Sequence, residues 1–259
     1  MSEMVQFSFA LSPRMRSFIE VRDALACLES ALVTQNSLYW LHAACDLRAS
    51  LLGDQGRKPV QPEIIGLLQD METYLNKVAK DLPHYSVRIQ ATCDNITNHI
   101  EKLHDGMREA CQLLSDDALI NAHLNSQKKH DWLGHKMCME QILKTFWKNS
   151  DDRTTPLHHA LVPLSDAVNT LDSMFNDFVS WSNHIAEGGV GQISPDRKSS
   201  FGLLVIGLPE EDVSRGIIPD ISGNRLAIRI RFQQWLPGQE AKDVSEDQPY
   251  AMMLVPVGH

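Results

Sequence analysis

The sequence predicts an α+β protein, in which an elongated α-helical domain is combined with a small antiparallel β domain. Apolar residues follow the helical period over most of the chain, whereas they alternate with polar residues near both ends, as in strands. An isolated strand is not stable, so the N-terminal strand has to pair with the C-terminal strands. We therefore expect a helical domain over residues 12–187 and a β domain made of residues 1–11 plus 195–259.

The first strand and the first helix are expected near the N-terminus. Residues 5–9 read Val-Gln-Phe-Ser-Phe, which is the alternation of a strand with one buried face. Ser12 can cap a helix, and Pro13 suits the first helical position. The stripe that follows has 3-4-3-4 spacing and consists of Phe18, Val21, Leu25, Leu28 and Leu32.

Further apolar stripes predict the remaining helices. They cover residues 38–52, 64–82, 86–114, 137–147 and 157–178. A further short helix, capped by residues 115–117, is expected to end at residue 124. The helix over 86–114 would be about 40 Å long, which is why the helical domain is expected to be elongated. Composition predicts a loop over 125–135 and a linker over 149–156.

The C-terminal part of the chain is expected to form the sheet. Glycines at 188, 189 and 191 end the helical period, and we expect a flexible connection there. Candidate strands cover residues 201–208, 225–232 and 251–257, and residues 221–224 supply a turn before the second of them.

Composition narrows the class of protein. The 259 residues include 24 Lys and Arg against 33 Asp and Glu, for a net charge of -9, so general nucleic-acid binding is not expected. The five cysteines are an odd number without a CxxC pair, and no signal peptide is evident, which indicates a reducing, cytoplasmic compartment. No run of 18 apolar residues occurs, so we expect no membrane insertion.

Enzyme motifs are not found in the sequence. It contains no HExxH, GxGxxG, Walker A or GxSxG pattern, so we expect no catalytic residues and no cofactor. The histidine pairs His99/His104 and His130/His135 are five residues apart, a spacing that does not place two side chains on one helix face, so no metal site is expected. A further hypothesis, from a different class of function, is that the protein is an enzyme whose reaction uses these histidines.

Arginines on the second candidate strand are the strongest binding candidates. Arg225, Arg229 and Arg231 lie opposite its apolar face, in a chain with excess negative charge. They could form a solvated strand face that discourages edge pairing, or a guanidinium patch that binds an acidic segment of a partner. The same two interpretations apply to Arg14, Arg16 and Arg22 of the first helix.

Two segments resemble one protein family. Val5-Gln6-Phe7, Leu11, and Met15-Arg16 before Phe18 and Ile19 resemble the N-terminus of ZapD-type cell-division proteins, which associate with FtsZ. Residues 221–229, Ile-Ser-Gly-Asn-Arg-Leu-Ala-Ile-Arg, are similar to a second stretch of that family, with a turn one residue shorter. The order of elements and the length also agree with the family.

The resemblance implies a function without catalysis. Members of the family are cytoplasmic homodimers that bind the C-terminal tail of FtsZ, bundle its filaments and are recruited to the midcell division ring. The apolar stripes of 86–114 and 157–178 independently favour a homodimer, because they offer more apolar face than a slim monomer covers. The candidate partner-binding residues are Arg16, Arg22, Arg225, Arg229 and Arg231.

The chain also departs from the family at basic positions. Glu20, Ser115 and Ala118 occupy places where the family tends to have basic residues. These departures motivate an alternative function, that of a dimeric helical adaptor of the same fold that binds another acidic or amphipathic protein segment.

Overall fold

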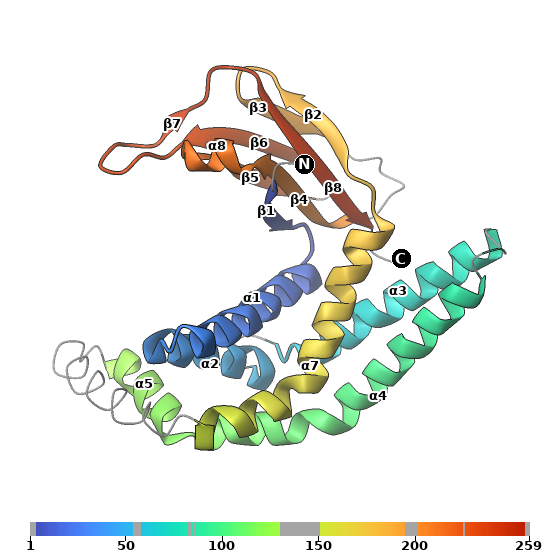
Figure 1. The fold of residues 1–259 in the computed structure, drawn as a ribbon, viewed down its shortest axis with the longest axis vertical. Helices are drawn as coiled ribbons and strands as arrows, with labels where there is room; N and C mark the ends of the chain where they lie inside the picture. The colour runs from blue at the N-terminus through green and yellow to red at the C-terminus, as the bar shows by residue number, and fades with distance from the viewer. Residues whose placement is uncertain are drawn as a thin grey trace. The chain divides into compact units, whose positions relative to one another are not determined.

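The computed structural model describes residues 4–53, 58–81, 84, 86–129, 151–194, 201–224 and 226–256 (Figure 1). The helices of this part of the chain are α1 (Pro13–Val33), α2 (Ser37–Leu52), α3 (Gln61–Asp81), α4 (Ser86–Asp116), α5 (Ala118–Lys129), α7 (Asp151–Phe178) and α8 (Glu210–Ser214). Its strands are β1 (Met4–Ala10), β2 (Ser182–Ala186), β3 (Val190–Ile193), β4 (Phe201–Pro209), β5 (Ile217–Asn224), β6 (Ala227–Gln234), β7 (Lys242–Asp243) and β8 (Gln248–Pro256). Helices in the middle of the chain and antiparallel strands from both ends confirm the α+β fold class.

The strands form two four-stranded antiparallel sheets. The first has the order β1-β4-β8-β2, and the second has the order β3-β6-β5 with β7 beside β6. β1 pairs with β4 in a register that places Phe7 opposite Ile206 and Phe9 opposite Leu204. The prediction that the N-terminal strand joins the C-terminal sheet is therefore confirmed.

An apolar core connects the two sheets. It contains Leu204, Ile206 and Leu208 of β4 together with side chains of β5, β6 and β8, and Phe7 and Phe9 of β1 pack against it. From β6, which alternates between buried and exposed residues, the core receives Ile228, Ile230 and Phe232. Both faces of β4 are buried, which explains why its sequence is an uninterrupted apolar run and not an alternating one.

A tight hairpin replaces the expected flexible connection near residue 188. β2 belongs to the first sheet and β3 to the second, and the chain passes between them through Gly188 and Gly189, whose φ angles are 55° and 75°. The Gly189 carbonyl accepts a hydrogen bond of 2.9 Å from the Phe232 amide of β6. The two glycines thus provide left-handed backbone at a crossing between sheets.

The chain divides into two compact units whose limits differ from the expected domains. One unit comprises Met1–Ile19 and Asp172–His259, and the other comprises Glu20–Leu171. The β unit therefore includes the start of α1 and the end of α7, where Phe18 contacts Phe175 edge to face with ring centroids 5.4 Å apart. It also includes β2, which lies before the expected limit at residue 187.

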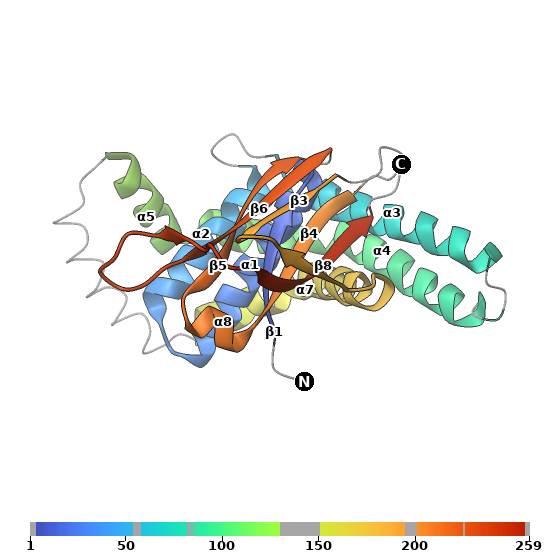
Figure 2. The same cartoon turned by 90° about the horizontal axis from the view of Figure 1, so that it is seen from above.

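In the helical unit, α3 and α4 lie side by side and antiparallel (Figure 1 and Figure 2). Gln61 Nε2 donates to the Leu103 carbonyl at 2.9 Å, and nearer the other end Thr97 Oγ1 donates to Glu72 at 3.5 Å. α4 has 31 residues, which corresponds to a length of about 46 Å and matches the long helix predicted from the sequence.

α4 also packs against α7 inside the helical unit. A Cβ atom on Gly106 would lie only 3.1 Å from Cγ of Pro163, so the glycine permits close approach of the two helices. Pro163 lies inside α7, where it removes one backbone hydrogen bond, and α7 is bent in Figure 1. Further along, His99 Nε2 and Thr170 Oγ1 are 3.0 Å apart.

Two segments expected to be irregular are partly helical. The expected loop over 125–135 is wrong in its first part, because α5 continues to Lys129. The expected linker over 149–156 is wrong for residues 151–156, because α7 begins at Asp151 and Pro156 lies inside it, where proline removes one backbone hydrogen bond. The predicted helix over 137–147 lies outside the described residues.

No described helix combines the length and the apolar character that crossing a bilayer would require.

Gly189 and Gly238 provide a matched test of the hairpin crossing. Their φ angles are 75° and 73°, but an added Cβ would lie 2.0 Å from the Val244 carbonyl oxygen at Gly189 and would meet nothing within 4 Å at Gly238. Gly238→Ala should cost about 1 kcal/mol, the usual penalty of left-handed backbone for alanine. Gly189→Ala should cost at least about 2 kcal/mol more, measured by urea unfolding. Equal losses in the two variants would contradict the steric argument.

His99 should make stability depend on pH. Burial lowers the pKa of its imidazole, against a smaller raising effect of Asp166 and alongside a lowering effect of Lys102. Because the unfolded chain keeps the ordinary value of about 6.5, protons bind the unfolded state more readily, and stability should fall as the pH drops below that value.

The measurement is the free energy of unfolding at pH 7.5 and at pH 5.5 for the wild type and for His99→Gln. The variant should lose less stability on acidification than the wild type. His104→Gln is the control, since His104 is exposed on the same helix. If His99→Gln loses as much unfolding free energy between pH 7.5 and pH 5.5 as the wild type does, the pH dependence comes from other groups.

Candidate functional site

The β5–β6 hairpin carries the arginines singled out from the sequence. Asn224 forms its turn, since Oδ1 accepts hydrogen bonds from the amides of Leu226 at 2.9 Å and Ala227 at 3.4 Å. The expected turn over 221–224 is therefore mostly strand, and the chain reverses after Asn224. Because side chains alternate along β6, Arg229 and Arg231 lie on the face turned away from the core. Arg225 lies outside the described residues.

We call this surface the arginine face. It is the outer face of the second sheet and comprises Val190, Gln192, Asp220, Ser222, Arg229, Arg231, Gln233 and Asp243. At one end, the indole Nε1 of Trp235 donates to Gln233 Oε1 at 3.3 Å, and the Trp235 side chain is 57% exposed. An exposed aromatic ring therefore lies beside a row of polar and cationic groups, a combination common in protein-binding surfaces.

Arg231 is bound by acidic groups of its own sheet. Its Nη2 is 2.8 Å from Asp220 Oδ2, and its Nε is 3.6 Å from Asp243 Oδ1. The hydrogen bond to Asp220 is the main cause that raises the pKa of the guanidinium, and the charge of Asp243 adds to it. A partner carboxylate at Arg231 would thus have to compete with two aspartates.

Arg229 has a different environment. Its cross-strand neighbours are Gln192 of β3 and Ser222 of β5, both neutral and exposed. In the part of the chain that the structure describes, no acidic group forms an ion pair with Arg229, and its side chain is exposed. Arg229 is therefore the guanidinium of the arginine face that is best placed to bind an external carboxylate.

The two arginines of α1 do not form one site. Arg16 is exposed near the start of the helix and belongs to the β unit, as Arg229 and Arg231 do. Arg22 belongs to the helical unit, is half-buried and forms an ion pair of 3.0 Å with its neighbour Asp23. The structure thus unites Arg229 and Arg231 on one face and places Arg22 in the other unit.

The pairing of Asp220 and Asp243 with Arg231 on the arginine face was not predicted from the sequence. A signal for Asp220 did exist: a hairpin that turns between Asn224 and Ala227 pairs residue 220 with residue 231. No comparable signal existed for Asp243, because β7 is two residues long and its pairing depends on a connection of irregular structure.

The thiols and histidines show little sign of reactive chemistry. Burial raises the pKa of Cys45 to about 12 and also raises the pKa of Cys93 and Cys111, so these thiols are protonated at neutral pH. Ser182 Oγ lies 2.8 Å from His184 Nε2, but the same hydroxyl also donates to the Met252 carbonyl. Among the described residues, no three His, Cys, Asp or Glu side chains are grouped to hold a metal ion.

Comparison with models of protein families gives no match, and comparison with curated proteins gives none. The candidate site is an exposed face of a β-sandwich with Arg229 between neutral neighbours, Arg231 held by two aspartates, and the exposed indole of Trp235 at one end.

Proposed function

We propose that this protein is a non-enzymatic cell-division factor of the ZapD type. In this function it binds the C-terminal tail of FtsZ, crosslinks FtsZ filaments as a homodimer and is recruited from the cytoplasm to the division ring at midcell. The resemblance of two segments to that family motivates the proposal, and the position of those segments in the fold supports it.

The main support is that the two resembling segments pack into one core. Phe7 of the first segment lies on β1, and Ile228 of the second lies on β6, and both contribute to the apolar layer between the two sheets. Segments separated by more than 200 residues thus contribute to one apolar core, one from each sheet. The second segment also presents Arg229 to solvent, next to its apolar contribution to the core.

Arg229 supplies the chemistry that tail binding requires. A guanidinium binds a carboxylate through paired hydrogen bonds. The exposed ring of Trp235 follows the other end of β6, about 20 Å along the strand from Arg229, so it can contact only a more distant part of a bound tail. A single exposed contact of this kind is weak, so crosslinking depends on two copies of the site in a dimer, which raises the effective concentration of the second contact.

One observation favours the alternative function of an adaptor for another segment. Arg231, which the resemblance offers as a second cation, is already bound to Asp220 and Asp243. A partner whose tail needs two neighbouring guanidinium groups would then bind poorly, whereas one that needs a single cation would still fit.

Sedimentation of FtsZ filaments tests the proposal. FtsZ from the same organism is polymerised with GTP and pelleted with and without this protein, and the experiment is repeated with FtsZ that lacks its C-terminal tail. We expect co-pelleting and bundling that depend on the tail. If a folded wild-type protein stays in the supernatant with full-length FtsZ, the FtsZ function is wrong and the adaptor function takes its place.

Variants of the arginine face test the site. Arg229→Glu should weaken tail-dependent binding about tenfold, the effect of one lost charged hydrogen bond. Asp220→Asn should strengthen binding, because it removes a competitor for Arg231. Arg215→Glu is the matched control with the same change of charge, since Arg215 is an exposed arginine of the same unit that pairs with Asp212 of α8. Unchanged binding of Arg229→Glu would remove the arginine face from the proposal.

Light scattering tests the homodimer on which crosslinking depends. At micromolar concentration the protein should scatter with twice the mass of one chain, because a monomer with one site cannot join two filaments. A monomer at that concentration would contradict crosslinking by bivalency even if the tail binds.

A further inference from the structure

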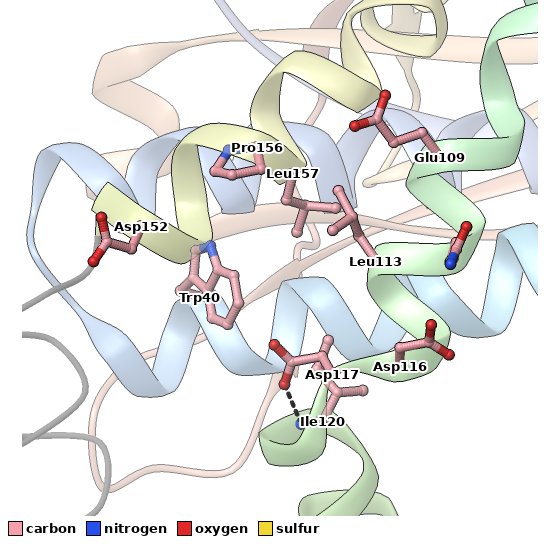
Figure 3. A pocket seen from close by; sticks show the side chains of 10 residues that line it. Trp40, Glu109, Leu113, Asp116, Asp117, Ile120, Asp152, Pro156 and Leu157 are labelled. Atoms are coloured by element: carbon pink, nitrogen blue, oxygen red, sulfur yellow. Dashed lines mark hydrogen bonds between the residues drawn. The ribbon is translucent and has the colours of Figure 1, made fainter.

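The helical unit contains a pocket of about 460 Å³ that is lined by side chains of α2, α4, α5 and α7 (Figure 3). Its apolar side chains Trp40, Ile120 and Leu157 are only 2%, 1% and 4% exposed, so they pack within the unit and leave almost no surface for a ligand. Asp117 of the lining caps α5, because its Oδ1 accepts hydrogen bonds from the amides of Leu119 at 2.8 Å and Ile120 at 2.9 Å. These residues contribute to helix packing, whereas the edge of the second sheet is suited to bind a partner.

The second sheet ends at β5. This strand pairs with β6 on one side, and among the described residues no strand lies on its other side. α8 contacts β5, and the bond from the Gly216 amide to the Val213 carbonyl places this helix at the Ile217 end of the strand. At the opposite end, residues 220–224 are exposed except for Ile221, which is half-buried. A free strand edge offers unpaired amides and carbonyls to which another strand can bind.

The pairing with β6 fixes which backbone groups of β5 face the free edge. The Trp235 amide donates to the Gly216 carbonyl at 2.8 Å, and these two residues are opposite one another in the register of the hairpin. Hydrogen-bonded and non-bonded pairs alternate between antiparallel strands, so residues 218, 220, 222 and 224 are also bonded to β6. The amides and carbonyls of Ile221 and Gly223 therefore point away from β6, and among the described residues no other group binds them.

Two further observations agree with this assignment. The Phe232 amide of β6 donates to the Gly189 carbonyl on the side of β3, so alternate residues of β6, including Arg229, are bonded to β5. Pro219 belongs to the outward series of β5, where a proline removes no bond from the sheet. An added strand would find no amide at Pro219, which restricts it to residues 220–224.

The row of side chains at Arg229 determines what kind of segment fits this edge. Ser222 lies opposite Arg229, is exposed, and is the last residue of the row before the free edge. A strand added beside β5 would lie two strand spacings, about 10 Å, from β6. The side chains of a glutamate opposite Ser222 and of Arg229 span this distance together. The small Ser222 side chain leaves the way open, and its hydroxyl can donate to the carboxylate.

The neighbouring row selects against a second carboxylate. Asp220 lies opposite Arg231 and is bound to it at 2.8 Å. In the added strand, the residue two positions from the glutamate shares its face and lies beside Asp220. Like charges on directly opposite residues destabilise a sheet, so a carboxylate there would be repelled. The edge therefore prefers a segment in which one acidic residue is followed or preceded, two positions away, by a neutral one.

We propose that an extended segment of the partner adds to the free edge of β5 as a further strand and binds Arg229 with one carboxylate. This mode of binding rests on the proposed function, since it takes Arg229 as the group that binds the acidic tail. Backbone hydrogen bonds to Ile221 and Gly223 supply affinity that a single exposed guanidinium lacks, and the side chains on the outer face supply the selection.

N-methylated peptides test strand addition on the full-length protein. The probe is the labelled, blocked peptide Thr-Val-Glu-Val-Gln-Val-Thr, in which the glutamate and the glutamine share one face. In the proposed complex the amides of the valines beside the glutamate bind β5, whereas the glutamate amide points away. In fluorescence anisotropy, N-methylation of either of these valines should lower the affinity at least about tenfold, and N-methylation of the glutamate should leave it nearly unchanged. Equal effects at the three positions would overturn strand addition.

Hydrogen exchange of single amides, followed by NMR, locates the bound peptide. The amides of Ile221 and Gly223 should exchange more slowly when the peptide is bound, because they become hydrogen-bonded. The Ser222 amide should change little, since it is already bonded to β6 in the free protein. A bound peptide that leaves the exchange of Ile221 and Gly223 unchanged would contradict the proposal.

Variants of β5 test the selection by charge. Ser222→Asp places a carboxylate opposite Arg229, as Asp220 lies opposite Arg231, and should weaken binding of the peptide about tenfold. Ser222→Asn is the matched control without the charge and should bind nearly as the wild type does. A second glutamate in place of the glutamine should weaken binding to the wild type but not to Asp220→Asn. Equal affinities of Ser222→Asp and Ser222→Asn would remove Arg229 from the complex.

Failure of strand addition and failure of the proposed function give different results. If the peptide does not bind the wild-type chain, strand addition is wrong, but FtsZ can still co-pellet through its tail in a manner that Arg229→Glu weakens. If the peptide results hold and FtsZ does not co-pellet, the edge of β5 binds a segment of another protein, and the adaptor function takes the place of the FtsZ function.

Discussion

The apolar layer between the two sheets is the interaction on which the β unit depends. It receives side chains from β1 at one end of the chain and from β4, β6 and β8 at the other, so it forms only when both ends have come together. The pairing of β1 with β4 satisfies the backbone of the N-terminal strand in the same step. A consequence is that the helical unit, Glu20–Leu171, is an insertion between two parts of one β-sandwich.

The arginine face follows from the same layer. Ile228, Ile230 and Phe232 are buried in it, and the alternation of a strand then turns Arg229 and Arg231 outward. The arginine face is thus the outer side of the sheet whose inner side stabilises the β unit.

The sequence predicted the long regular elements well and the junctions less well. Strong periodicity identified β1, α1 to α4, α7 and three C-terminal strands, because a stripe or an alternating pattern reflects which side of an element is buried. The pattern is uninformative at residues 125–129, which are polar yet helical, and at residues 151–156, where a proline lies inside a helix. β2 and β3 were missed because they are short, and glycines between them indicate a connection without showing whether it is loose or tight.

The sequence by itself determined the class of the fold, the outward position of Arg229 and Arg231 and the joining of the N-terminal strand to the C-terminal sheet. These properties depend on local periodicity and on the need of a strand for partners. Tertiary structure decided which arginine is available. Asp220 and Asp243 reach Arg231 only through the register of β5 and β7 on β6, whereas Arg229 faces neutral neighbours in the same register. Tertiary structure also decided that α4 and α7 approach closely at Gly106 and Pro163, because a distance between helices is set by packing and is not encoded in the spacing of either helix.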